Sequence, residues 1–221
     1  MLKQIFNIKS VIFDMDGVIT NTMPDHYQAW KEIFKKEGLR ITHHDVYSRE
    51  GQPGTAFVYE VYEQYKLSIT NPKVEAILKA KEVLFKKIVK TRFIQGSRTF
   101  LKDLHKSGFK LALVTGTARH ELHQILPDSI YNLFDIIVTG NDVKHGKPHP
   151  EPYQKALRKL KITAVDAFVI ENAPFGIKAA KAAGIKCLAL ETSLPSKYLQ
   201  EADGIFKSIK ELREKINFKG A

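Results

Sequence analysis

The chain has 221 residues, of which 43% are apolar, and 35 Lys and Arg against 24 Asp and Glu give it a formal net charge of +11. Its single cysteine, Cys187, excludes an intramolecular disulfide and a cysteine-rich zinc site. No apolar run approaches the ~20 residues of a membrane-spanning helix, and residues 1–13 are too poor in apolar residues for a signal peptide. We therefore expect a cytoplasmic protein with no membrane partner, built as one large domain or as a core with a smaller insertion.

The chain begins with one predicted strand, and only helices follow it up to about residue 90. A β-branched and aromatic run at residues 10–13 predicts a buried strand, which ends at the acidic turn Asp14-Met15-Asp16-Gly17. A proline and an aspartate at 24–25 are typical of a helix start, and glycines and a proline at 51–54 mark a loop. The helices predicted in this part cover residues 24–38, 56–65 and 72–89.

From about residue 93 onward, strands and helices alternate, which is typical of βαβ units and a mostly parallel sheet. The predicted strands cover 109–114, 135–139, 167–170, 186–190 and 204–206, and the predicted helices cover 97–106, 119–126, 149–160, 174–183 and 208–216. The sequence therefore predicts the α/β class: a Rossmann-like parallel sheet core into which an all-helical segment is inserted after the first strand.

Polar side chains follow four of the predicted strands. Because ligands bind beyond the carboxyl ends of the strands in such sheets, these residues are the candidates for a site. Each short pattern alone is common in turns and helix caps, but their succession along the chain indicates one shared pocket. The candidates are Asp14 and Asp16; Thr115, Gly116 and Thr117; Lys147; and Glu171 with Asn172.

These residue types complement one another chemically. Carboxylates on neighbouring strand ends repel one another, and Mg²⁺ with oxygen ligands and a substrate phosphate resolves that repulsion. A lysine and a Thr-Gly turn suit the remaining phosphate oxygens. One aspartate can then act as a nucleophile that forms an aspartyl-phosphate, while a second acid two residues away moves the proton. The composite predicts phosphoryl transfer.

The same residues resemble the haloacid dehalogenase-like superfamily of phosphohydrolases over essentially the whole chain. Residues 14–20 resemble its first motif, Thr115 its second, Lys147 within 146–153 its third, and 171–184 its fourth. The helical insertion, and residues 26–31 in particular, resemble the α-helical cap of the β-phosphoglucomutase-like branch. The resemblance implies a core domain of residues 1–20 and 94–221 and a cap domain of residues 21–93.

The resemblance also implies a role for each motif residue. Asp14 would be the nucleophile and a Mg²⁺ ligand, and Asp16 the general acid and base, with its main-chain carbonyl on the metal. Glu171 and Asn172 would complete the metal shell, directly or through water. Thr115, Gly116 and Thr117 would hold the phosphoryl group, and Lys147 would balance its charge. The superfamily's dehalogenases lack an acid at the position of Asp16, which argues against carbon–halogen chemistry.

Three positions depart from the family pattern. Asn172 and Asn21 stand where Asp is common, and the neutral amide of Asn172 can coordinate Mg²⁺ without contributing charge. Gly54 falls near the place of an arginine with which the mutase grips a second phosphate, which favours hydrolysis over mutase chemistry. His26 and Lys81 are the candidates for substrate contact from the cap, and the loop Arg49–Thr55 is expected to influence specificity.

We therefore expect a Mg²⁺-dependent phosphatase of small phosphorylated metabolites, with sugar phosphates as the expected class. A sugar phosphomutase and a catalytically weakened metabolite-binding protein on the same fold remain alternatives. The stretch Lys73–Arg92 carries seven cations and two glutamates, a pattern that suits nucleic acid but is more typical of a solvated helix face, so we expect no nucleic-acid partner. The oligomeric state stays open, and a monomer is compatible with the sequence.

Overall fold

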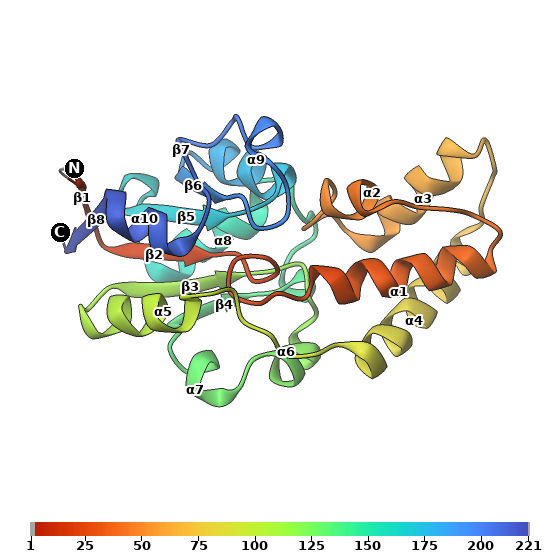
Figure 1. Ribbon diagram of the computed structural model, residues 1–221, viewed down its shortest axis with the longest axis horizontal. Helices are drawn as coiled ribbons and strands as arrows, with labels where there is room; N and C mark the ends of the chain where they lie inside the picture. Colours follow the sequence, from red (N-terminus) through yellow and green to blue (C-terminus); the bar gives the residue numbers. More distant parts are fainter. Residues whose placement is uncertain (1–2, 221) are drawn as a thin grey trace.

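A six-stranded parallel sheet in the order β4-β3-β2-β5-β6-β7 forms the centre of the computed structural model, which describes residues 3–220 (Figure 1). This arrangement confirms the predicted α/β class. The strands of the sheet are β2 (Ser10–Phe13), β3 (Lys110–Val114), β4 (Ile136–Val138), β5 (Ala167–Glu171), β6 (Lys186–Leu190) and β7 (Gly204–Phe206).

Helices cover both faces of this sheet and one of its ends. The helices that follow β2 directly are α1 (Met23–Lys36), α2 (His43–Tyr47), α3 (Gly54–Gln64) and α4 (Asn71–Ile88). The later helices are α5 (Ser97–Lys106), α6 (Arg119–Ile125), α7 (Asp128–Tyr131), α8 (Glu151–Leu160), α9 (Pro174–Ala182) and α10 (Ile209–Lys215). Figure 1 shows α1 to α4 gathered at one end of the sheet, opposite the two termini.

The central strand β2 divides the hydrophobic core into two layers, because successive side chains of a strand point to opposite faces. Val11 and Phe13 pack in one layer with α5, α6 and α10, whereas Ile12 packs in the other layer with α8 and α9. Strand β2 pairs with β3 on one side and with β5 on the other. The order of the strands thus reverses at β2, and such a switch point is where open α/β sheets bind their ligands.

The inserted helices have a hydrophobic core of their own. In α1, Trp30, Ile33 and Phe34 recur at helical spacing and are buried against α3 and α4. The rings of Trp30 and Phe57 meet edge to face with centroids 5.1 Å apart. No helix among residues 3–220 is long and apolar enough to cross a membrane.

Two crossing segments join these helices to the sheet. Thr20 and Phe93 form an antiparallel bridge, and the backbone N–H of Asn21 donates to the Arg92 carbonyl over 2.8 Å. The Arg92 guanidinium in turn lies 2.6 Å from the Asp25 carboxylate at the start of α1. The division into a core (1–20 and 94–221) and a cap (21–93) remains our proposal, and it falls at this pair of crossings.

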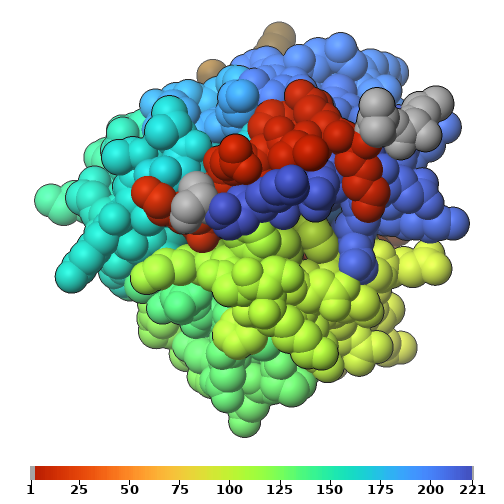
Figure 2. Space-filling view, turned by 90° about the vertical axis from the view of Figure 1, so that its left-hand side faces the viewer, coloured from red at the N-terminus to blue at the C-terminus, as the bar shows by residue number. Residues whose placement is uncertain are grey.

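A second small sheet lies outside the elements predicted from the sequence. Strands β1 (Gln4–Ile8) and β8 (Ile216–Gly220) pair in parallel, so the two ends of the chain lie side by side (Figures 1 and 2). The helix predicted over 208–216 accordingly ends at Lys215. The short helices α2 and α7 were not predicted either, and each spans five residues or fewer, too short to show a helical period.

Truncation of a buried apolar side chain should destabilise the protein more than truncation of an exposed one. Leu113 on β3 is fully buried, so Leu113→Ala should lower the free energy of unfolding by about 2–5 kcal/mol through lost burial and a residual cavity. Val165 is 84% exposed, and Val165→Ala should change the free energy of unfolding by less than about 0.5 kcal/mol. Urea unfolding followed by circular dichroism measures both, and equal midpoints would contradict this placement of Leu113.

Candidate functional site

The site is organised around one buried lysine. Lys147 Nζ lies 2.6 Å from Asp14 Oδ1 and 2.7 Å from Glu171 Oε1, and it donates to the carbonyl of Val114 over 3.2 Å. The three charged residues are each less than 5% exposed. Three strand ends therefore meet at this ammonium: Asp14 follows β2, Val114 ends β3 and Glu171 ends β5.

The charges of this cluster shift its protonation equilibria. Burial raises the pKa of Asp14 to about 8; Lys147 opposes that shift, and Glu171 and Asp16 reinforce it. Burial alone would lower the pKa of Lys147, but the two adjacent carboxylates outweigh it and raise the pKa. One ammonium thus does not fully compensate its two carboxylates. A further positive charge beside Asp14 would favour the ionised form that a nucleophile needs.

Glu171 is held by the start of α9 as well as by Lys147. Its Oε2 accepts the backbone N–H groups of Asn172 and Ala173 over 2.9 and 3.3 Å, and its Oε1 accepts the hydroxyl of Tyr153 on α8 over 2.7 Å. Both carboxylate oxygens thus already have partners, and direct ligation of a metal would displace one of them. Gly176 makes this packing possible, because a Cβ there would overlap the Glu171 carboxylate.

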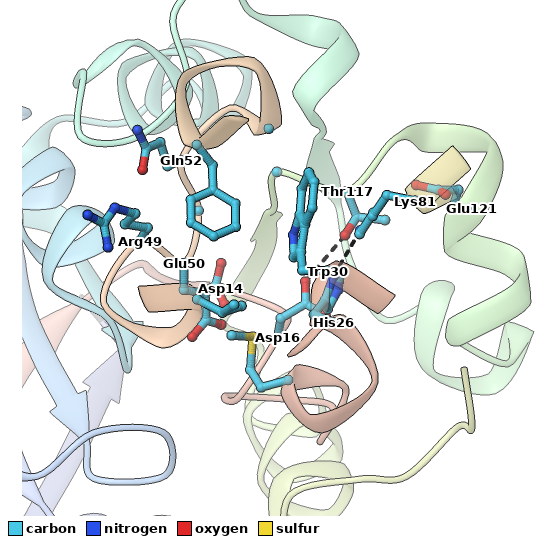
Figure 3. A pocket seen from close by; sticks show the side chains of 16 residues that line it. Asp14, Asp16, His26, Trp30, Arg49, Glu50, Gln52, Lys81, Thr117 and Glu121 are labelled. Atoms are coloured by element: carbon cyan, nitrogen blue, oxygen red, sulfur yellow. Dashed lines mark hydrogen bonds and ion pairs between the residues drawn. The ribbon is translucent and has the colours of Figure 1, made fainter. Parts of the chain in front are cut away.

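Asp16 is connected to two predicted cap residues. His26 Nε2 lies 3.5 Å from Asp16 Oδ1, and His26 Nδ1 lies 3.0 Å from Lys81 Nζ, so His26 stands between the two (Figure 3). Thr22 donates its hydroxyl to the same carboxylate. Burial would raise the pKa of Asp16, but the contacts with His26 and Thr22 outweigh burial and lower it.

Aromatic rings lie against the side chains of His26 and Lys81. The His26 ring stacks on Phe85 at 4.1 Å, and Lys81 Nζ lies 4.5 Å from the Phe85 ring centroid and 5.6 Å from that of Trp30. Burial lowers the pKa of Lys81 to about 8. Lys81 therefore belongs to the pocket, although it comes from the basic stretch whose pattern is typical of a solvated face.

The turn after β3 supplies hydroxyl and amide groups. The backbone N–H of Thr117 donates to Thr115 Oγ1 over 3.1 Å, and the Thr117 hydroxyl donates to Asp16 Oδ2 over 3.3 Å. Gly116 lines the cavity beside Asp14. All the residues predicted from the strand ends therefore lie in one place, together with His26 and Lys81.

One residue of the site was not predicted. Glu50, on the loop between α2 and α3, is 8% exposed and accepts a hydrogen bond from Asn172 Nδ2 over 2.8 Å. Burial raises the pKa of Glu50, and the charges of Asp14, Asp16 and Glu171 add to that shift. The sequence pointed to this loop but carried no signal for Glu50 itself, because a glutamate next to an arginine in a loop resembles a surface residue.

The oxygen atoms of the site fit a hard divalent cation. Asp14 Oδ2, Asn172 Oδ1 and Glu50 Oε1 are buried and have no hydrogen-bond partner within the described part of the chain. A buried polar atom without a partner is costly, and carboxylate and amide oxygens are the ligands that Mg²⁺ takes. Asp14 and Asn172 are two of the predicted metal ligands.

A second group of potential metal ligands lies where α4 meets α6. Single ligand atoms of Glu82, His120 and Glu121 lie within 4.8 Å of one another. Lys86 Nζ lies 2.5 Å from Glu82 Oε1 and 3.1 Å from His120 Nε2, so an ammonium already balances this group. We assign it no metal.

The cavity above Asp14 is small and has two kinds of wall. It encloses about 170 Å³, below the ~300–1,000 Å³ of pockets that hold drug-sized ligands. The sheet contributes Asp14, Asp16 and the Gly116–Thr117 turn, and the inserted helices contribute both charged and apolar side chains (Figure 3). The apolar contributors are Met23, Trp30, Val46 and Phe57.

Known proteins share this combination of fold and site. Residues 11–190 match the family described as haloacid dehalogenase-like hydrolase. A validoxylamine A 7'-phosphate phosphatase from Streptomyces hygroscopicus subsp. limoneus is 29% identical over 208 residues, which cover 93% of this chain and 96% of the relative. A phosphorylated carbohydrates phosphatase from Thermotoga maritima is 32% identical over 183 residues, which cover 81% of this chain and 83% of that protein.

A solved structure agrees with these relatives. A protein from Bacteroides vulgatus, provisionally named a beta-phosphoglucomutase, superposes with a TM-score of 0.84 at 33% identity, covering 96% of this chain and 88% of that one. The chain belongs to the haloacid dehalogenase-like hydrolase family, as its four motifs indicated. It is a phosphohydrolase with a β-phosphoglucomutase-like fold.

A substitution at Gly176 tests the close contact between α9 and the Glu171 carboxylate. In Gly176→Ala the new methyl group would push the Glu171 carboxylate away from Lys147 and Tyr153, so unfolding should require about 1–3 kcal/mol less free energy and phosphatase activity should fall sharply. Thermal unfolding and phosphate release measure the two effects. Gly220→Ala is the control, because nothing lies within 4 Å of a Cβ there. Unchanged activity and stability in Gly176→Ala would contradict the described contact.

Proposed function

We propose that the protein is a Mg²⁺-dependent phosphatase of small phosphorylated metabolites, with sugar phosphates as its class, and that it works through an aspartyl-phosphate on Asp14. The observation that carries this proposal is the buried contact of Lys147 with both Asp14 and Glu171. Lys147 engages Oδ1 of Asp14 and leaves Oδ2 without a partner in the described chain.

The proposed reaction has two halves. In the first, an Asp14 oxygen attacks phosphorus, the bond from phosphorus to the leaving oxygen breaks, and Asp16 gives that oxygen a proton. In the second, Asp16 takes a proton from water, the water oxygen attacks phosphorus, and the bond from phosphorus to Asp14 breaks. Inorganic phosphate and the free alcohol are the products, and both aspartates return to their starting forms.

The surroundings of Asp16 suit this alternation. The contacts from His26 and Thr22 lower the pKa of Asp16, which favours the ionised form that accepts a proton from water. A bound phosphate brings negative charge next to Asp16 and raises its proton affinity, which favours the protonated form that the first half needs. His26 contacts Asp16, and Lys81 contacts His26. Both belong to the proposed cap, so we expect these contacts only while the cap covers the site.

The remaining charged and polar groups act on the phosphoryl group. We assign Lys147 to the compensation of negative charge that builds up between Asp14 and the phosphate. We assign Thr115, the Gly116 N–H and Thr117 to the remaining phosphoryl oxygens. Mg²⁺, when bound, would polarise the phosphoryl group and offset the charge of Asp14, and the residues whose free oxygens fit it are Asp14, Asn172 and Glu50.

The size and lining of the cavity support a small substrate. A volume of about 170 Å³ suits a phosphate group with a short polar body, and the apolar wall from the cap suits the carbon face of a sugar. Two relatives bear the names of phosphatases of phosphorylated carbohydrates or of a sugar-like phosphate, which supports the same class.

Mutase chemistry is the second candidate, because the Bacteroides vulgatus neighbour bears that name. A mutase has to hold a second phosphate under the cap. Gly54 packs against Leu78 and Trp30 and presents no cation, and Arg49 lines the cavity but pairs with Glu60 over 2.5 Å. The arginine of this loop is thus already paired with a carboxylate, which weakens the hold on a second phosphate and favours water over a sugar hydroxyl as the acceptor of the phosphoryl group.

A panel of pentose phosphates, hexose phosphates and pyrophosphate, assayed with Mg²⁺ and with EDTA, tests the proposal. We expect Mg²⁺-dependent release of inorganic phosphate from at least one sugar phosphate, and Asp14→Asn should lower kcat by about 10³-fold or more. The control is Asp128→Asn, whose side chain is 84% exposed and should leave kcat unchanged.

Three outcomes would contradict the proposal. Full turnover in Asp14→Asn would remove Asp14 as the nucleophile, and a phosphate-conserving isomerisation seen by ³¹P NMR would favour the mutase. Absence of turnover across the panel, with binding of one of its members, would favour a metabolite-binding protein.

A further inference from the structure

One carboxylate of the site, that of Glu50, comes from the inserted helical segment. Glu50 belongs to the inserted helical segment, yet it is 8% exposed and lines the cavity together with Asp14 and Asp16 (Figure 3). The next residue, Gly51, has φ +80°, and a Cβ there would lie 2.7 Å from Lys147 Cδ. The turn that carries Glu50 therefore lies directly against the Lys147 side chain.

Glu50 determines which way the Asn172 amide points. Asn172 Nδ2 donates to Glu50 Oε2 over 2.8 Å and to Ser193 Oγ over 2.7 Å. With both N–H groups engaged, the amide oxygen Oδ1 has to face the other way, where it is buried and finds no partner within residues 3–220. When Glu50 is ionised, as a metal ligand is, a flipped amide would set its oxygen against a carboxylate that carries no hydrogen to donate.

Glu50 also changes the charge of the site. Four buried carboxylates, Asp14, Asp16, Glu50 and Glu171, stand against the ammonium groups of Lys147 and Lys81. When all are ionised, two negative charges remain, which a divalent cation would cancel. Asn172 contributes an oxygen but no charge, so without Glu50 the site would hold one negative charge only.

We propose that Glu50 is part of the cation site: its Oε2 orients the Asn172 carbonyl oxygen toward the cation, and its free Oε1 supplies the negative charge that the neutral amide lacks. Glu50 thus joins the cap to the metal, and the cation binds most tightly when the cap is closed. This inference rests on the proposed function, because it takes the divalent cation from there.

Three free oxygens from separate segments carry the inference. Asp14 Oδ2, Asn172 Oδ1 and Glu50 Oε1 come from the end of β2, the end of β5 and the cap loop, and all three residues are more than nine-tenths buried. A role for Glu50 in cap packing alone would not leave one of its oxygens buried without a partner.

The test is direct binding of Mn²⁺, followed by the loss of its free EPR signal, with Mg²⁺ as competitor and no substrate present. Glu50→Gln should bind both cations about tenfold more weakly, because a group that tunes a metal site typically changes affinity by ~10–100-fold. Asn172→Asp should bind them more tightly. The double variant Glu50→Gln/Asn172→Asp should return close to the wild-type affinity, since its carboxylate has moved from residue 50 to residue 172.

Ser193→Ala is the matched control. It removes the other acceptor of Asn172 Nδ2 without changing the charge, so it should weaken binding by less than about threefold. Equal losses in Ser193→Ala and Glu50→Gln would overturn the charge role of Glu50. Without added cation, the midpoint temperature of thermal unfolding should be unchanged or slightly higher in Glu50→Gln than in the wild type. A marked fall of this temperature would make Glu50 a structural residue instead.

Cation binding by the wild type distinguishes a failure of the role of Glu50 from a failure of the proposed function. If the wild type binds Mn²⁺ and Mg²⁺ and Glu50→Gln binds them equally well, Glu50 is not part of the site, and the phosphatase proposal stands. If the wild type binds neither cation at millimolar concentration, the metal dependence of the proposed function fails, and the role of Glu50 fails with it.

Discussion

The buried ammonium of Lys147 is the interaction on which the rest of the site depends. It joins Asp14 and Glu171 at 2.6 and 2.7 Å, at the ends of two adjacent central strands. Bringing two carboxylates this close inside a protein is unfavourable unless a positive charge lies between them. Removal of one member of such a buried group typically costs about 3–5 kcal/mol, because its partners keep their charge without compensation.

The order of the strands in the sheet brings this group together. Strands β3, β2 and β5 are neighbours, and the polar groups after each of them meet because parallel strands end at the same edge. The close approach of α9 then requires Gly176, and the close approach of the cap loop requires Gly51. Small residues stand where the backbone has to come near a buried charge.

The cap completes the electrostatics of the site as well as covering it. Lys81 and His26 bring a positive charge and a ring N–H toward Asp16, and Glu50 brings a negative charge toward Asn172. These contacts cross from the inserted helices to the sheet, so both parts of the chain contribute charge to one site. The inserted helices also shield these charges from water, which strengthens the interactions between them.

The sequence predicted the sheet and the strand-end residues well, because both rest on local patterns. A continuous apolar strand such as 167–170 followed by Glu171 can be recognised from a few neighbouring residues. The pairing of β1 with β8 could not, since it joins the two ends of the chain and neither strand is strongly apolar. Glu50 was missed for a related reason: its burial follows from how the cap packs on the core, and no residue near it in the sequence signals that contact.

We propose that Asp14 carries the phosphoryl group during turnover. The most direct measurement is acid quenching of the protein during turnover of a sugar phosphate, followed by peptide mapping by mass spectrometry after borohydride treatment. The account predicts that only the peptide containing Asp14 is modified, and that the modification disappears once substrate is exhausted. Modification of a different residue, or steady turnover with no trapped phosphoryl group on Asp14, would contradict it.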